Sequence, residues 1–151
     1  MKQRKNYFRW ILVIGWMVVI FLFSNDPADI SNEKSDFIIN LVNILGIDLN
    51  STLGELANFI VRKIAHFTEY FILYLLVFNA LRNDFYLRKA LIISLIITFI
   101  YACSDEIHQI FIPGREGMFR DVLIDTLGGV FALVIISLYK KFRGKVTKKS
   151  C

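Results

Sequence analysis

Residues 90–115 read ALIISLIITFIYACSDEIHQIFIPGR, an apolar run that continues without a break into two acids, a histidine and a glutamine. The run belongs to a segment from about residue 87 to residue 111 that is long enough to cross a bilayer as one helix. Ionisable side chains inside such a helix are costly to desolvate, and they indicate a functional site by default. We therefore expect other segments to supply partners for these side chains.

Three further segments have the length and composition of membrane-spanning helices, which need about 20 residues. They cover about residues 7–24, 56–81 and 119–139. The chain is 56% hydrophobic, which exceeds the ~45–50% that is typical of soluble domains. We predict an all-α, polytopic integral membrane protein in which residues 1–151 form a single domain with four transmembrane helices. Gly128 and Gly129 in the last of these helices are expected to allow close helix packing.

A shorter apolar pattern lies between the first two predicted spans. In residues 35–47, apolar side chains recur at helical spacing on one face, but the segment is too short to span a bilayer. We predict a short amphipathic helix that lies at the membrane interface on the outer side. Residues 24–34 are polar and contain Pro27, so we expect a turn there.

The distribution of lysine and arginine sets the expected orientation. These residues gather before the first span, between residues 82 and 89, and in a basic tail over residues 140–151. The positive-inside rule places all three regions in the cytoplasm. We therefore expect a multi-pass protein of the cell membrane with both termini cytoplasmic. The net charge of +5 follows from these flanking clusters and does not indicate a nucleic-acid partner.

This orientation brings polar side chains from three spans into the outer half of the bilayer. Lys63, His66 and Glu69 recur every three to four residues and share one helix face. In the third span, Ser104, Asp105 and His108 are expected to share a stripe. The residues that we predict to form a binding pocket are Lys63, His66, Glu69, Tyr70, Ser104, Asp105, Glu106, His108, Gln109, Arg115, Arg120, Asp121 and Asp125.

Three stretches together resemble the VanZ-like membrane protein family. They are RKIAHFTEY at residues 62–70, SDEIHQIFIPGR at residues 104–115 and RDVLIDTLG at residues 120–128. The resemblance covers nearly the whole chain. It implies a small polytopic protein of the bacterial cell envelope, related to proteins that confer low-level teicoplanin resistance. Asp125 departs from the family pattern, in which we expect asparagine in many relatives.

Two classes of function fit these residues. The one that we favour is non-enzymatic binding of a lipid headgroup or another amphiphile, such as a lipoglycopeptide, in the outer-leaflet pocket. Its partners would be membrane lipids and a lipid-linked envelope precursor or lipoglycopeptide. The alternative is a membrane-embedded hydrolase or transferase that acts on a lipid-linked substrate. The candidate catalytic residues are then His66, Glu69, Asp105 and His108, because acid–base chemistry needs such pairs.

We expect no metal and no other cofactor. His66 and His108 with neighbouring carboxylates could in principle hold zinc, which accepts nitrogen and oxygen ligands. However, the sequence contains no HExxH or comparable two-histidine motif, and lysine and arginine compete for the same acids. A purely structural alternative for the whole cluster is an ion-pair network that fixes helix packing. The oligomeric state stays open.

Overall fold

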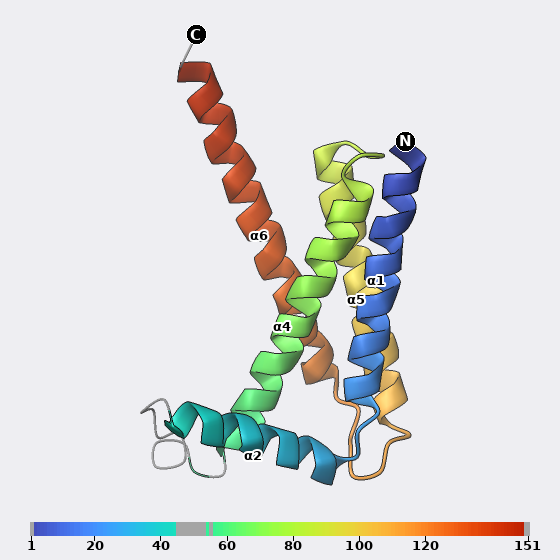
Figure 1. Ribbon diagram of the computed structural model, residues 1–151, viewed down its shortest axis with the longest axis vertical. Helices are drawn as coiled ribbons and strands as arrows, with labels where there is room; N and C mark the ends of the chain where they lie inside the picture. Colours follow the sequence, from blue (N-terminus) through green and yellow to red (C-terminus); the bar gives the residue numbers. More distant parts are fainter. Residues whose placement is uncertain (1, 45–53, 55, 150–151) are drawn as a thin grey trace.

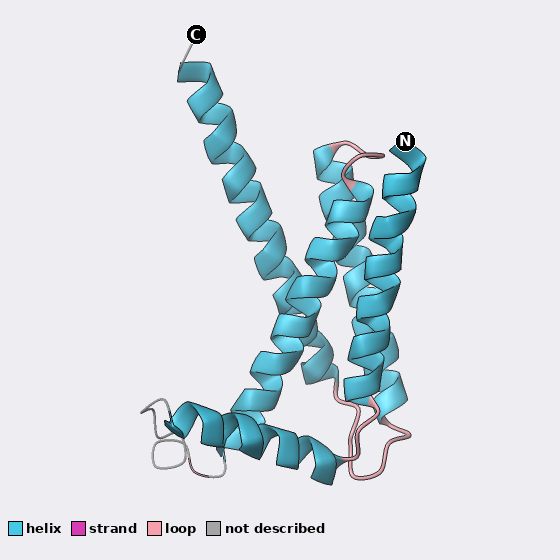
Figure 2. Ribbon diagram, in the orientation of Figure 1, coloured by secondary structure: helices cyan, strands magenta, loops and turns pink. Residues whose placement is uncertain are grey.

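The computed structural model describes residues 2–44, 54 and 56–149. This part of the chain is helical and contains no strand (Figure 2). Its helices are α1 (Lys2–Ser24), α2 (Ala28–Ile44), α4 (Leu56–Leu81), α5 (Leu87–Gln109) and α6 (Phe119–Lys149). Four of them, all except α2, are long and apolar enough to cross a membrane. The predicted all-α class with four membrane-spanning helices is therefore confirmed.

The helices α1, α4, α5 and α6 run along the long axis of the molecule (Figure 1). Both ends of the chain and the α4–α5 turn lie at one end of the bundle. The opposite end carries the α5–α6 loop and the helix α2, which lies crosswise to the other four. A short helix across the bundle end is the arrangement expected of an interfacial amphipathic helix.

The helix α2 begins earlier than we predicted. It starts at Ala28, directly after Pro27, so the expectation of a turn through residue 34 was wrong. Proline is tolerated at a helix start, where its missing N–H is not needed. The Pro27 carbonyl accepts the Ser31 N–H at 3.0 Å, and Asp29 in the first turn suits the positive end of the helix dipole. The predicted end of this helix, residues 45–47, lies outside the described residues.

The last helix also differs from the prediction. The helix α6 continues to Lys149, whereas we expected the span to end near residue 139 and a basic tail to follow. Lysine and arginine are good helix formers, and positive charge suits the end of a helix dipole. The helix α5 ends at Gln109, within two residues of the predicted boundary, which is the usual uncertainty of helix ends.

The helix α4 is at the centre of the bundle and contacts α1, α2, α5 and α6. Its fully buried side chains include Tyr70, Leu73 and Tyr74. Polar groups in this core donate hydrogen bonds to backbone carbonyls of neighbouring helices. The Tyr74 hydroxyl donates to Leu91 of α5 at 3.0 Å, and the Trp16 indole of α1 donates to the Glu69 carbonyl at 2.9 Å. These bonds fix the position of α4 between its neighbours.

The close contact between α4 and α6 depends on Gly128. A Cβ atom at this position would collide with the Phe67 carbonyl oxygen and lie 3.0 Å from the Phe71 backbone nitrogen. Both obstacles belong to the α4 backbone and cannot rotate away. The helices approach because glycine has no side chain, as the sequence predicted.

We expect the substitution Gly128→Ala to destabilise the protein by about 1–3 kcal/mol, the usual cost of overpacking. Gly15→Ala is the matched control, since a Cβ atom at Gly15 in α1 meets nothing within 4 Å. That change should be neutral or stabilise the helix by about 0.5–1 kcal/mol. Unfolding in mixed detergent micelles measures both effects. An equal response of the two variants would contradict the packing role of Gly128.

Candidate functional site

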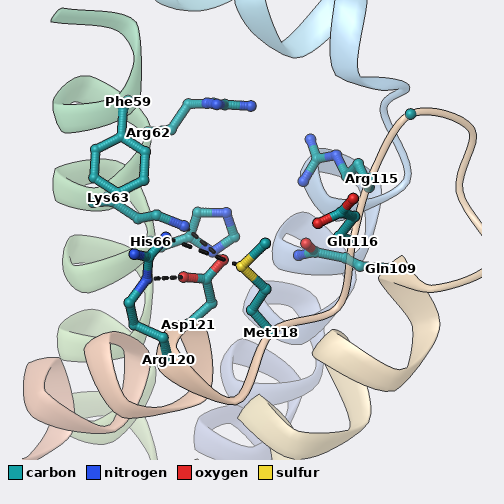
Figure 3. Close-up of a pocket in the computed structure, with 11 residues that line it drawn as sticks. Phe59, Arg62, Lys63, His66, Gln109, Arg115, Glu116, Met118, Arg120 and Asp121 are labelled. Carbon is teal, nitrogen blue, oxygen red and sulfur yellow. Dashed lines mark hydrogen bonds and ion pairs between the residues drawn. The ribbon is translucent and has the colours of Figure 1, made fainter. Parts of the chain in front are cut away.

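Polar side chains from α4, α5 and α6 gather at the bundle end that carries α2. A cavity of about 370 Å³ opens there between the first turns of α4, the start of α6 and the α5–α6 loop (Figure 3). It is lined by Phe59, Arg62, Lys63, His66, Gln109, Gly114, Arg115, Glu116, Met118, Arg120 and Asp121. We call this space the first cavity. Its lining contains four lysine or arginine residues and two acids, so it favours negatively charged groups.

An ion pair between α4 and α6 closes one side of the first cavity. The Lys63 ammonium lies 2.6 Å from one Asp121 oxygen, and the Arg120 guanidinium lies 4.0 Å from the other. Both cations also lie over the Phe59 ring, at 5.2 Å and 5.3 Å from its centroid. Two positive charges therefore share one carboxylate and one aromatic face, which leaves this side of the cavity positively charged.

A second cavity of about 270 Å³ lies under α2. The helices α1, α2 and α4 contribute Phe23, Ile38, Val61 and Ala65 to its lining, together with Asp26, Ser31, Lys34, Ser35 and Glu69. Arg62, His66 and Arg115 line both cavities. These three side chains therefore separate a polar compartment from a more apolar one.

The two arginines of this partition lack acidic partners. In the described part of the chain, neither Arg62 nor Arg115 has a carboxylate within 4.0 Å, and the Nε atom of each is buried without a hydrogen bond. The best contact of Arg115 is a long one, 3.5 Å from Nη2 to the Phe23 carbonyl. Burial lowers the pKa of Arg115, and the charge of Arg62 lowers it further, while Asp26 opposes the shift. Since a guanidinium stays protonated, the partition carries positive charge that an anion would stabilise.

Behind the partition lies a buried layer to which all four long helices contribute. Asp125 of α6 is 0% exposed, and its Oδ1 atom lies 3.6 Å from the His66 Nδ1 atom of α4. Asp105 of α5 is also buried, and it accepts a long hydrogen bond of 3.4 Å from the Gln109 amide. The same amide donates to the Ser24 hydroxyl of α1 at 3.1 Å. This layer joins all four long helices.

Glu106 lies outside this buried layer, at the contact between the end of α5 and the start of α6. Its carboxylate accepts the Met118 N–H at 2.9 Å, just before α6 begins. A carboxylate at a helix start satisfies an unpaired N–H and suits the dipole. Glu106 therefore holds the α5–α6 loop against the end of α5, and it lines neither cavity.

The remaining predicted site residues are dispersed. Ser104 is exposed and donates to the Tyr101 carbonyl at 2.7 Å, so the stripe expected for Ser104, Asp105 and His108 was wrong. His108 packs against the Phe21 ring of α1 at 4.6 Å and lines neither cavity. Tyr70 is fully buried near Asp105. The structure thus separates the two histidines.

Sequence reasoning omitted several residues that line the cavities. Arg62 is the most important one, and it stood next to Lys63 in the first motif. Helical spacing could have found it, because Arg62 lies four residues before His66 and seven before Glu69 and so shares their face. Ser31 and Lys34 of α2 were missed because their segment was expected to be a turn. Phe59, Glu116 and Met118 carry no sequence signal that distinguishes them from ordinary lining residues.

Comparison with protein-family models gives one match. A family described as VanZ/LLP1 matches residues 8–140, which is most of the chain. No curated protein and no solved structure shows significant similarity.

We expect Lys63 and Asp121 to be energetically coupled. Lys63→Met or Asp121→Asn alone should cost about 1–3 kcal/mol, because each leaves a half-buried charged group without its partner. The double variant should cost less than the sum. The matched control is the Lys34–Asp26 pair, which is 2.5 Å long, with Lys34 half exposed, and should couple by less than about 1 kcal/mol. Double-mutant cycles in micelles measure both, and equal coupling would contradict this prediction.

Proposed function

The chain belongs to the VanZ/LLP1 family, and from this premise we propose that it binds the anionic headgroup of an amphiphile at the bundle end that carries α2. The clusters of lysine and arginine at the opposite end support a cytoplasmic location for both termini. The binding end would then face the outer leaflet of the bacterial cell membrane. The sequence resemblance to teicoplanin-resistance proteins supports a ligand related to lipoglycopeptides or to the envelope lipids with which they interact.

The observation that carries this proposal is the pair of unneutralised arginines. Arg62 and Arg115 extend toward the same space from α4 and from the α5–α6 loop (Figure 3). Buried guanidinium donors without acceptors are costly, and a phosphate or carboxylate group satisfies two of them at once. Lys63 and Arg120 add positive charge on the far side of the first cavity. A phosphate-bearing headgroup fits this chemistry best.

The second cavity supports an amphiphile over a simple anion. Its apolar lining begins directly behind Arg62 and Arg115, so one molecule can place its charge in the first cavity and an apolar chain under α2. The outer face of α2 exposes Phe37 and Leu41, which suits a helix that rests on the bilayer surface. A lipid could therefore reach the second cavity from the membrane without crossing water.

One observation bears on the enzyme alternative. His66 lines both cavities, and a carboxylate oxygen of Asp125 lies 3.6 Å from its ring nitrogen. A general base must reach the proton that it removes, which supports His66 over His108 for this role. If the protein turns over a lipid-linked substrate, His66→Ala should abolish the reaction and His108→Ala should reduce it much less.

We expect wild-type protein to bind phosphatidylglycerol more tightly than zwitterionic phosphatidylcholine. Arg62→Gln and Arg115→Gln should each weaken binding of the anionic lipid by about 10-fold or more, the equivalent of one charged hydrogen bond. The control is Arg82→Gln, because Arg82 is exposed at the opposite end of the bundle. Native mass spectrometry from detergent micelles with lipid titration measures the affinities. If both glutamine variants bind phosphatidylglycerol as the wild type does, the headgroup site is not at this partition.

We also expect expression of the protein to protect a sensitive Gram-positive host against teicoplanin. Protection should be lost with Arg115→Gln, because the variant lacks the central headgroup contact, and kept with Arg82→Gln. The inhibitory concentration is measured at matched membrane levels of each variant. Full protection by Arg115→Gln would separate the cavity from any role in resistance.

A further inference from the structure

A histidine and two aspartates meet behind the partition, each from a different helix. Potential ligand atoms of His66 (α4), Asp105 (α5) and Asp125 (α6) all lie within 4.8 Å of one another. Asp125 is 0% exposed, and neither of its oxygen atoms has a hydrogen-bond partner among the described residues. The His66 Nδ1 atom is also buried without a partner. Both oxygen atoms of Asp125 and the His66 Nδ1 atom are therefore buried side by side without hydrogen-bond partners.

The spacing of these atoms is that of ligands around a common centre. The distance of 3.6 Å between His66 Nδ1 and Asp125 Oδ1 is too long for a hydrogen bond. In a tetrahedral zinc site with bonds of about 2.1 Å, neighbouring ligand atoms lie about 3.4 Å apart. His66 and Asp125 already have nearly this separation. A shift of at most about 1.4 Å brings the most distant pair of the group, at 4.8 Å or less, to the same value.

The charges in this layer also favour a bound cation. Asp105 and Asp125 place two buried carboxylates beside one imidazole, and Lys63 on the same helix as His66 is bonded to Asp121 instead. Buried carboxylates are stable only when paired, protonated or bound to a metal. A proton on Asp125 would neutralise one carboxylate but would still need an acceptor, and none lies within hydrogen-bond distance in the described residues. A divalent cation neutralises both carboxylates and occupies all the unpartnered atoms.

The site also has a supporting group and an entry path. The Gln109 amide donates to Asp105 at 3.4 Å and so helps to orient a possible ligand, as groups next to metal ligands usually do. His66 lines both cavities, so a hydrated ion can reach the site from the first cavity. Three protein ligands leave a fourth position for water or for a ligand atom of a bound molecule.

We propose that His66, Asp105 and Asp125 bind a divalent transition metal of the zinc class at the junction of α4, α5 and α6. The sequence suggested zinc only in principle, at His66 and His108 together, and we expected no metal because no two-histidine motif was present; the proposed site uses His66 without His108. The proposal is independent of the headgroup proposal, since binding of zinc and of lipid are measured separately.

The test uses full-length protein purified in detergent with a tag that contains no histidine, since the chain itself has only two. The protein is stripped with a chelator, equilibrated with zinc chloride and desalted, and bound zinc is measured by mass spectrometry. We expect about one zinc per chain in the wild type. Asp125→Asn, which is nearly isosteric, should weaken zinc binding by more than the 10- to 100-fold that is typical of losing a supporting residue.

His108→Gln is the control, because His108 is not one of the three proposed ligands and lines neither cavity, and the variant should keep about one zinc. Cobalt in place of zinc should give the visible spectrum of a tetrahedral nitrogen and oxygen site, without the charge-transfer band of a cysteine ligand. Zinc should raise the melting temperature of the wild type and not that of Asp125→Asn. A cooperative melting transition of Asp125→Asn also shows that this variant is folded. A wild type without zinc, or an Asp125→Asn variant that binds zinc as the wild type does, overturns the proposal.

Discussion

A charged side chain inside an apolar helix bundle must meet an opposite charge or lose much of the stability that the bundle gains by packing. The arrangement of α4, α5 and α6 depends on this constraint. Lys63 on α4 meets Asp121 on α6 at 2.6 Å, and Glu106 on α5 accepts the backbone N–H of Met118 just before α6. Gly128 allows the backbones of α4 and α6 to come close enough for the contact between Lys63 and Asp121 to form. The polar groups therefore determine which helices meet, and glycine determines how closely they approach.

Some charged side chains of the bundle lack an opposite charge, and these side chains lie together around His66. Arg62 and Arg115 lack an acid on one side of His66, while Asp125 lacks a donor on the other. Stability alone would pair such groups with each other or replace them with apolar side chains. Unpaired cations face a cavity that suits a phosphate, and the unpaired Asp125 carboxylate lies with Asp105 and His66 around a point that suits a metal ion. The two proposals thus concern neighbouring parts of one junction.

Hydropathy and flanking charge were sufficient to predict four spanning helices, because both signals are averaged over many residues. The shared face of Lys63 and His66 was also predictable, since helical spacing alone defines it. The positions of Ser104 and His108 were not. Both residues lie on α5, whose polar residues occupy several faces. The sequence does not show that α1 presents Phe21 to His108. The meeting of Asp105 with Asp125 likewise depends on how two helices cross, which no local pattern encodes.

The helix α6 packs closely against α4 only along its first half and then leans away from the bundle (Figure 1). Beyond Gly129 it exposes Val134, Ile135 and Leu138, and 42–49% of the surface of each is not covered by protein. In a membrane, acyl chains take that place. The tilt of a helix that is surrounded by acyl chains depends on the thickness of the hydrocarbon layer, because the apolar length of the helix must match that thickness. A thicker or thinner bilayer would therefore pull on the same helix that carries Asp121 and Asp125, and the shape of the junction would respond to lipid composition.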